Sequence, residues 1–182
     1  MEIPLNITDL LLDKSNSDAI SEFAKKFDID DAQAKDAIST LANSLSQGLG
    51  YHTKKDTGLG NLFDALKKGK HSRYLDNPSL FDRKETTQDG NDILGHIFGN
   101  KDVSRHVAKR ASKKTGLSSS LLKKMLPIVA TMVMGALGKN MFGGSKKQTQ
   151  GSTGFLTKIF DKDGDGSMVD DVLGMAFKAA FR

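Results

Sequence analysis

An apolar run, MLPIVATMVMGALG at residues 125–138, constrains the fold of this chain more than any other segment. A helix built from it is apolar on every face, and such a helix must be covered by other elements on several sides. The run covers about fourteen residues, fewer than the roughly 20 that a membrane-spanning helix needs. It therefore predicts a buried core helix and no membrane span. Pro127 lies too far inside for the first turn of this helix, so we expect a kink or a restart there.

A weak internal repeat indicates helices on both sides of the middle of the chain. Moving the sequence by 88 positions places Lys25 over Lys113 and Leu41 over Val129. Other pairs at the same offset are Ile29 with Leu117, Leu45 with Val133 and Gly50 with Gly138. The repeat predicts two helical units of similar construction.

Each copy is predicted to form a helix, a short turn and a longer second helix. In the first copy, apolar residues recur every three or four positions on both sides of DIDD, residues 28–31, which offers a helix N-cap. Gly48 or Gly50 is expected to end the second helix. In the second copy, KTGLSSS, residues 114–120, supplies a glycine stop and a serine N-cap, which places the start of the next helix near Ser119.

Polar segments divide the rest of the chain. One is rich in turn formers and contains an apolar cluster, Leu59–Leu66, that predicts a short helix, and another has the Gly/Ser/Gln composition of a flexible connector. The chain is therefore predicted to be all-α, with two helix-turn-helix-like repeats and a C-terminal helix preceded by a D-x-D-x-D-G loop. Its segments are an N-terminal helical repeat at 1–50, a polar linker at 51–89, a helical core at 90–140, a flexible linker at 141–153 and the tail at 154–182.

Several motifs resemble one known family. ILGHIFG, KKTGLSSS and LPIVATMVMGALG lie within residues 90–138, and DKDGDGSMVDDVLG follows near the C-terminus. In these motifs the chain resembles the bacterial YidB-like family, a domain of unknown function. The resemblance implies an all-helical, homeodomain-like fold. It transfers no catalytic residue, because the family has no established activity.

The C-terminal tail carries DKDGDGSMVDD, residues 161–171, a pattern typical of calcium loops. Ca²⁺ takes about six to eight oxygen ligands, and a D-x-D-x-D-G loop presents side chains at alternate positions around a sharp glycine turn. Val172 stands at the twelfth position, where a bidentate acid is expected, so Asp170 or Asp171 would have to close the shell. The predicted ligands of a structural calcium ion are Asp161, Asp163, Asp165, Ser167, Asp170 and Asp171.

The same segment has a simpler interpretation as an Asp/Gly turn. Ser167 would then cap the last helix, and Asp170 and Asp171 would favour its positive end. Five carboxylates within eleven residues repel one another without a cation, which favours the ion site. Calcium fits better than magnesium, because the loop offers many protein oxygens and little rigid octahedral geometry.

Charge is distributed unevenly between the two copies. Residues 93–140 hold nine Lys or Arg and one acid, whereas residues 8–40 hold eight acids and four Lys. Basic side chains four residues apart lie on one face of a helix, opposite its apolar face. The basic stripe consists of Lys101, Arg105, Lys109, Arg110, Lys113 and Lys114.

Two functions fit this charge pattern. The acidic copy of one chain could meet the basic copy of another chain or of itself, which describes an interaction or assembly protein that binds a protein partner or associates with itself. Alternatively, the basic stripe could bind nucleic-acid phosphates, in keeping with the sequence pI of about 9.3. A recognition helix must present polar side chains to base edges, however, and the second helix of the basic copy is apolar.

No enzyme class is indicated. The chain has no cysteine, which excludes disulfides, thiolate metal sites and a cysteine nucleophile. Its four histidines form no H-x-x-x-H pair, and neither a G-x-S-x-G motif nor a phosphate loop occurs, so no small-molecule substrate can be identified. The N-terminus lacks the pattern of a secretory signal. We therefore expect a non-enzymatic protein of the bacterial cytoplasm.

Overall fold

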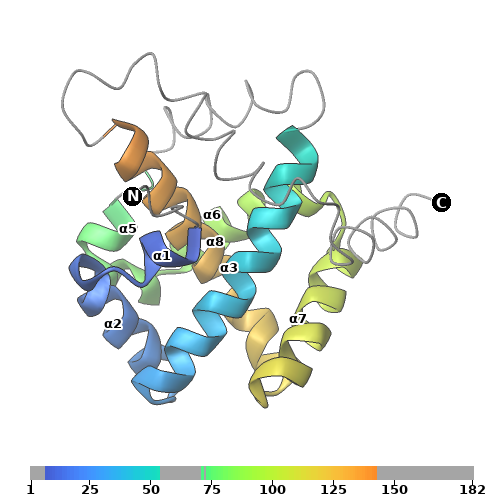
Figure 1. The fold of residues 1–182 in the computed structure, drawn as a ribbon, viewed down its shortest axis with the longest axis horizontal. Helices are drawn as coiled ribbons and strands as arrows, with labels where there is room; N and C mark the ends of the chain where they lie inside the picture. Colours follow the sequence, from blue (N-terminus) through green and yellow to red (C-terminus); the bar gives the residue numbers. More distant parts are fainter. Residues whose placement is uncertain (1–6, 54–70, 72, 143–182) are drawn as a thin grey trace, which may run out of the picture.

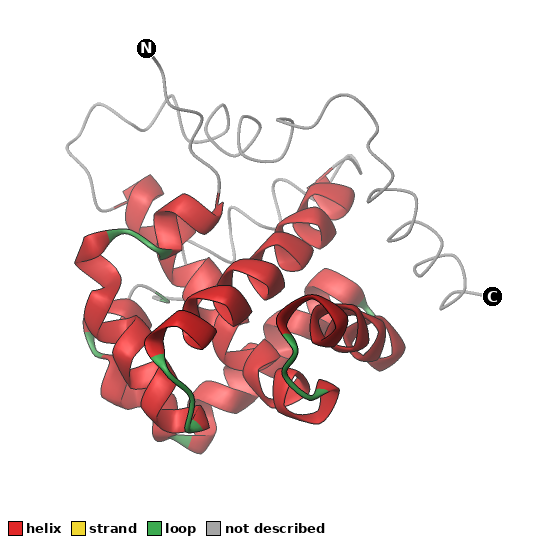
Figure 2. Cartoon of the chain, turned by 60° about the horizontal axis from the view of Figure 1, so that its bottom comes forward, coloured by secondary structure: helices red, strands yellow, loops and turns green. Residues whose placement is uncertain are grey.

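The computed structural model describes residues 7–53, 71 and 73–142, and within these ranges every regular element is a helix (Figures 1 and 2). The all-α prediction is confirmed over this part of the chain. The elements are α1 (Ile7–Leu11), the 3₁₀ turn η1 (Lys14–Asn16), α2 (Ser17–Phe27), α3 (Asp31–Thr53), α5 (Arg73–Asp76), the 3₁₀ turn η2 (Pro78–Asp82), α6 (Lys84–Phe98), α7 (Lys101–Thr115) and α8 (Ser119–Phe142).

The predicted core helix is α8, and it lies at the centre of the bundle (Figure 1). It packs against α1, α3, α5, α6 and α7. Every residue from Met125 to Leu137 is buried, including Thr131, whose hydroxyl donates to the carbonyl of Ile128 at 2.6 Å. The apolar run is therefore covered on all sides, as its sequence requires.

By length and composition alone, one segment of the described chain could cross a membrane. This is Ser119–Lys139 of α8, with a mean hydropathy of 1.5, and 78% of its most apolar window is buried inside the protein. A core helix of a soluble protein has the same length and composition. The burial of α8 among five other helices matches the expected core helix.

Two close helix crossings depend on glycines. Gly90 of α6 lies directly against the backbone of Pro127, so a side chain at position 90 would overlap the Pro127 carbonyl. α8 passes through Pro127 without a restart. Gly48 lies within α3 and faces α6, where an added Cβ would come within 2.7 Å of Ile97 Cγ2. The expectation that α3 ends at Gly48 or Gly50 is wrong, because Gly48 serves the helix contact and α3 continues to Thr53.

Part of the expected polar linker is packed structure. Of the stretch assigned to residues 51–89, the described part from Arg73 onward forms α5, η2 and the first turns of α6. Tyr74 and Phe81 are 1% exposed, and buried Thr86 donates its hydroxyl to the Leu80 carbonyl at 2.5 Å. A few well-spaced apolar side chains anchor this polar segment. The linker interpretation is therefore wrong for residues 73–89, because the segment contributes to the core.

Two helix–turn–helix pairs, α2–α3 and α7–α8, occur where the sequence predicted them. Asp30 caps α3, since its carboxylate accepts from the Gln33 amide at 2.7 Å and the Gln33 side chain accepts from the Asp30 amide at 3.3 Å. Ser118 caps α8 by accepting from the Leu121 amide at 3.2 Å. The expected N-caps are therefore confirmed, and α8 begins at Ser119 as predicted.

Several predicted segments lie outside the described residues. These are the short helix at 59–66, the connector beyond Phe142 and the tail at 154–182 with its aspartate loop and last helix. Described structure on that side ends with α8 at Phe142, two residues past the predicted boundary at 140.

Candidate functional site

The basic stripe of the sequence forms the exposed face of α7. Val103, Val107, Ala108 and Ala111 turn into the core, and this fixes the opposite side of the helix toward solvent. All six predicted basic residues are exposed: Lys101, Arg105, Lys109, Arg110, Lys113 and Lys114. Lys123 and Lys124 of α8 are exposed as well. The structure therefore exposes all six residues along α7, and their action as one binding surface remains a prediction from the sequence.

A tight turn between α6 and α7 sets where this basic face begins. Gly99 ends α6 in the left-handed region, with φ of 68°, and its amide donates to the Gly95 carbonyl at 2.9 Å. Asn100 then caps α7 by accepting from the Asp102 amide at 2.8 Å. The turn places Lys101 at the first position of α7, facing the end of α6.

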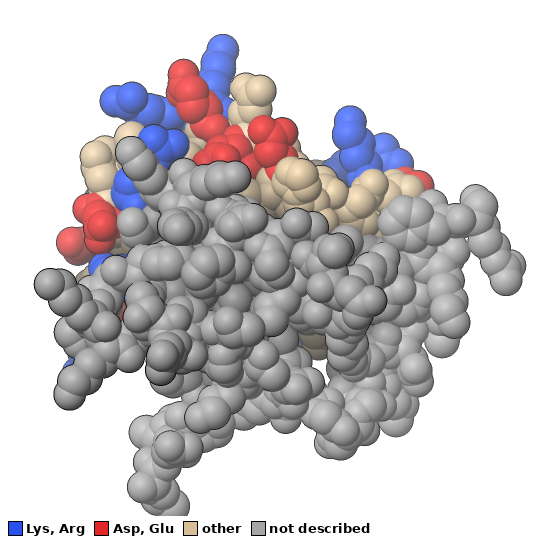
Figure 3. Space-filling view, turned by 90° about the horizontal axis from the view of Figure 1, so that it is seen from above, with Lys and Arg blue, Asp and Glu red and all other residues tan. Residues whose placement is uncertain are grey.

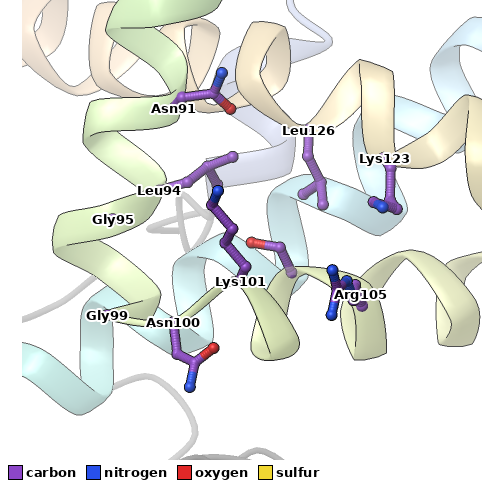
Figure 4. Close-up of a pocket in the computed structure, with 10 residues that line it drawn as sticks. Asn91, Leu94, Gly95, Gly99, Asn100, Lys101, Arg105, Lys123 and Leu126 are labelled. Atoms are coloured by element: carbon purple, nitrogen blue, oxygen red, sulfur yellow. The ribbon is translucent and has the colours of Figure 1, made fainter.

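A pocket of about 570 Å³ lies where α6, α7 and α8 meet (Figure 4). Lys101 reaches from α7 toward Leu94 of α6, and Lys123 of α8 lies on the other side of the pocket, beyond Arg105 (Figure 4). The lining residues are Asn91, Leu94, Gly95, Gly99, Asn100, Lys101, Ser104, Arg105, Lys123 and Leu126. The pocket thus combines an apolar base with cationic and amide side chains.

Two of the three cations at this pocket have no carboxylate partner among the described residues. Arg105 pairs with Asp102 at 2.8 Å, and both side chains are largely exposed, at 62% and 59%. No ion pair involves Lys101 or Lys123 within the ranges that the structure describes. Among the described residues, the lining holds cationic and amide side chains and neither a carboxylate nor a histidine, so these residues attract anions.

The position of α8 limits how the basic surface can act. In a helix-turn-helix protein that reads DNA, the second helix of the pair enters the major groove. Here the second helix is α8, whose residues from Met125 to Leu137 are buried, leaving Lys123 and Lys124 exposed near its start. Base contacts by α8 beyond its exposed start would therefore require the core to open, whereas contact of α7 with phosphates would not.

An acidic turn lies on another part of the same body. Asp28, Asp30 and Asp31, between α2 and α3, are all exposed. Of the two neighbouring lysines, Lys26 pairs with Asp82 at 3.5 Å and Lys25 with Glu22 at 2.8 Å, and Glu22 and, to a smaller extent, Asp31 of the turn raise the pKa of Lys25. Where the described surface is visible from above, Figure 3 shows a group of both signs on the left and a mainly basic group on the right.

The structure also contains a polar cluster that the sequence did not reveal. Tyr74 donates its hydroxyl to the Asp89 carboxylate at 2.6 Å and accepts from Arg73 at 3.0 Å. His71, 8% exposed, places Nδ1 3.3 Å from the same carboxylate but outside hydrogen-bonding geometry. Burial lowers the pKa of His71, and the Asp89 charge opposes that shift. The cluster joins α5 to α6, and no motif links residues so far apart in sequence.

The predicted calcium ligands cannot be placed. Asp161, Asp163, Asp165, Ser167, Asp170 and Asp171 all lie outside the described residues. Within the described ranges, no group of three or more His, Asp or Glu side chains is arranged to hold a metal ion. The calcium loop remains a prediction from the sequence.

Comparison with known proteins gives a family and no assigned function. No curated protein and no solved structure matches the chain. A family model described as a bacterial protein of unknown function, DUF937, matches residues 9–140. The match covers most of the chain and both helix–turn–helix pairs, and it is consistent with the resemblance to YidB-like proteins. The chain therefore belongs to this bacterial family, DUF937.

Proposed function

We propose that this chain is a non-enzymatic assembly protein of the bacterial cytoplasm, which joins to copies of itself through surfaces of opposite charge. One observation carries the proposal, namely the separation of exposed charges within one packed body. The basic face belongs to α7 and the start of α8, and the acidic turn joins α2 to α3. Complementary charges steer association and determine which surfaces meet. A protein partner with an acidic surface would compete for the same basic face.

Light scattering at two protein concentrations and in rising salt tests the proposal. The average mass should increase with concentration at low salt. It should decrease as salt is added, because the screening length falls from about 10 Å at 0.1 M to about 3 Å at 1 M ionic strength. A mass that stays at that of one chain, 19.7 kDa, at all concentrations in low salt would contradict self-assembly.

The aspartate loop adds calcium to this proposal. Asp161, Asp163 and Asp165 supply hard oxygen ligands at alternate positions, and a bound ion would relieve the repulsion between them. The role assigned to the ion is structural, ordering the tail. Calorimetry should record calcium binding by the parent protein and none by the Asp163→Ala, Asp165→Ala double variant. Equal heats from the two proteins would remove the loop as the binding site.

Nucleic-acid binding is the second candidate, favoured by the exposed basic face of α7. Lys101, Arg105, Lys109, Arg110, Lys113 and Lys114 all face solvent and could contact phosphates without rearrangement of the core. The buried state of α8 argues for contacts that are independent of base sequence. A gel-shift series in rising salt should then show a steep loss of affinity. The absence of any shift at low salt would eliminate this function.

A further inference from the structure

The pocket between α6, α7 and α8 has the chemistry to receive one particular part of a second copy. We propose that it binds the acidic turn between α2 and α3, residues 28–31, of another molecule of this chain. This contact rests on the proposed assembly function and names the two surfaces that the assembly would use.

The turn presents concentrated negative charge. Asp28, Asp30 and Asp31 are three carboxylates within four residues, all exposed, and none forms an ion pair within the described part of the chain. Asp30 uses one carboxylate oxygen to cap α3 through the Gln33 amide. The other carboxylates project from a turn whose backbone is held by hydrogen bonds at both ends, so little conformational entropy is lost on docking.

The pocket presents the complementary charge. Lys101, Arg105 and Lys123 line it, and only Arg105 has a carboxylate partner among the described residues, the exposed Asp102. Leu94 and Leu126 form an apolar base beneath these cations. Ion pairs formed over such a base are partly shielded from water, which strengthens them relative to pairs on an open surface. A volume of about 570 Å³ accommodates a few side chains rather than a whole helix.

The two surfaces lie on different sides of the molecule. In Figure 1 the turn from α2 into α3 is at the lower left, whereas α6 meets α7 at the right. A chain in this conformation therefore cannot place its own turn in its own pocket. Because the contact joins two different surfaces, repeating it generates a ring when the rotation closes and a filament when it does not.

Paired charge reversals test this contact. A turn variant carries Asp28→Lys and Asp31→Lys, sparing Asp30 because it caps α3. A pocket variant carries Lys101→Glu and Lys123→Glu, neither of which removes an ion pair found in the described structure. The two Asp→Lys changes raise the formal charge from +5 to +9 and the two Lys→Glu changes lower it from +5 to +1, so both variants remain net positive. General attraction between oppositely charged proteins therefore cannot account for association in their mixture.

Control variants carry the same charge changes elsewhere. Asp18→Lys with Glu85→Lys matches the turn variant, and Lys14→Glu with Lys84→Glu, both outside the basic face and the pocket, matches the pocket variant. All four residues are exposed. Circular dichroism verifies that each variant keeps the helical content of the parent, so that a loss of assembly cannot be assigned to misfolding.

Sedimentation should show that the parent and both controls assemble, while the turn and pocket variants each lose at least about tenfold in association constant. An equimolar mixture of the turn and pocket variants should recover assembly, because every turn then meets a pocket of opposite charge. If the parent assembles and the mixture does not recover, or if the controls lose as much as the site variants, the pocket–turn contact is wrong and the assembly function stands. A parent that never assembles would overturn both.

Discussion

The two helix–turn–helix pairs build a similar turn in two different ways. In each pair a residue in the left-handed region ends the first helix, a half-buried apolar residue follows, and a side-chain oxygen caps the second helix. The left-handed residues are Asp28, with φ of 55°, and Gly116, with φ of 78°. The caps are Asp30 and Ser118, so both features recur at an offset of 88 positions, the offset found in the sequence.

The two turns differ in how they close. In the α2–α3 turn, the amides of Asp28 and Ile29 donate to the carbonyls of Lys25 and Ala24 at 3.2 and 3.0 Å, which is the Schellman pattern. In the α7–α8 turn, the Gly116 amide donates to the Ser112 carbonyl at 2.9 Å, the simpler left-handed motif. Similar chain reversal is therefore reached with different residues, and the surfaces that result carry opposite charge.

The second helices differ more than the turns. α3 buries one side, with Ala34, Ala37, Ile38 and Leu41 fully inside, and exposes polar residues such as Lys35 and Asp36 on the other. α8 is buried on all sides from Met125 to Leu137. Local geometry alone therefore does not determine the role of each pair. α8 supplies the core and α3 covers it, so α3 exposes charge on one side whereas α8 exposes none between Met125 and Leu137.

The largest effect is expected where α6 crosses α8. In Gly90→Ala the new Cβ would overlap the backbone of Pro127, which cannot rotate away, so α6 and α8 must separate. We expect a loss of about 3 kcal/mol or more in the free energy of unfolding, measured by urea denaturation. Gly95→Ala, in the same helix with open space around it, is the control and should stabilise the protein by about 0.5–1 kcal/mol.

The contact of α3 with α6 should tolerate an added side chain better than the contact of α6 with α8. In Gly48→Ala the new Cβ meets the ends of side chains, Ile97 Cγ2 at 2.7 Å and Phe98 Cε1 at 2.8 Å, and these ends can shift. A net loss of about 1–2 kcal/mol is expected, smaller than for Gly90→Ala because part of the overlap can relax. Equal losses at the two positions would show that the α6–α8 contact at Gly90 tolerates an added methyl group as well as the α3–α6 contact at Gly48 does.

The left-handed positions of the two turns should respond in opposite directions. Asp28→Gly relieves a conformation that favours glycine and removes a negative charge from the C-terminal end of α2, so a gain of about 1 kcal/mol is expected. Gly116→Ala places a side chain in the left-handed region and should lower the free energy of unfolding by about 1 kcal/mol. The open space around the new Cβ offers no contact that would compensate for this cost. Both changes are measurable by urea denaturation. A loss in Asp28→Gly would mean that its carboxylate stabilises the turn.

Removing the two N-caps should change the free energy of unfolding by more similar amounts than the glycine substitutions do. Asp30→Ala and Ser118→Ala each remove a side-chain acceptor and should cost about 1 kcal/mol in unfolding free energy. Asp30→Ala should be the larger loss, because the hydrogen bond that it removes is accepted by a carboxylate at 2.7 Å, whereas the bond to Ser118 is accepted by a neutral hydroxyl at 3.2 Å. Asp30→Asn retains an acceptor and serves as the control. If Ser118→Ala is the more damaging change, the charge of the Asp30 acceptor contributes little.

Features of this fold that depend on residues close together in the sequence could be predicted, whereas features that depend on distant residues could not. Helix periodicity, the caps at Asp30 and Ser118 and the basic face of α7 depend on residues within one or two turns, and all three were predicted. Gly48 was misassigned because a glycine that ends a helix and one that admits a neighbouring helix have the same local sequence. The packing of residues 73–89 and the pocket at Lys101 depend on α6 and α8 coming together, which no local pattern contains.

The smallest predicted effect on stability concerns the polar cluster of His71, Arg73, Tyr74 and Asp89. The α2–α3 turn has no equivalent of this cluster. Burial lowers the pKa of His71 below its ordinary 6.5, while Asp89 raises it and Arg73 lowers it. Between the lowered pKa and 6.5 the unfolded chain binds a proton that the folded chain does not, so stability should fall as the pH drops through about 6.5. Urea denaturation at pH 7.5 and 5.5 measures this loss, which should be absent in His71→Gln. In Asp89→Asn the opposing charge is gone, the pKa of His71 falls further, and the loss should extend to lower pH. An unchanged pH dependence in both variants would exclude His71 as its source.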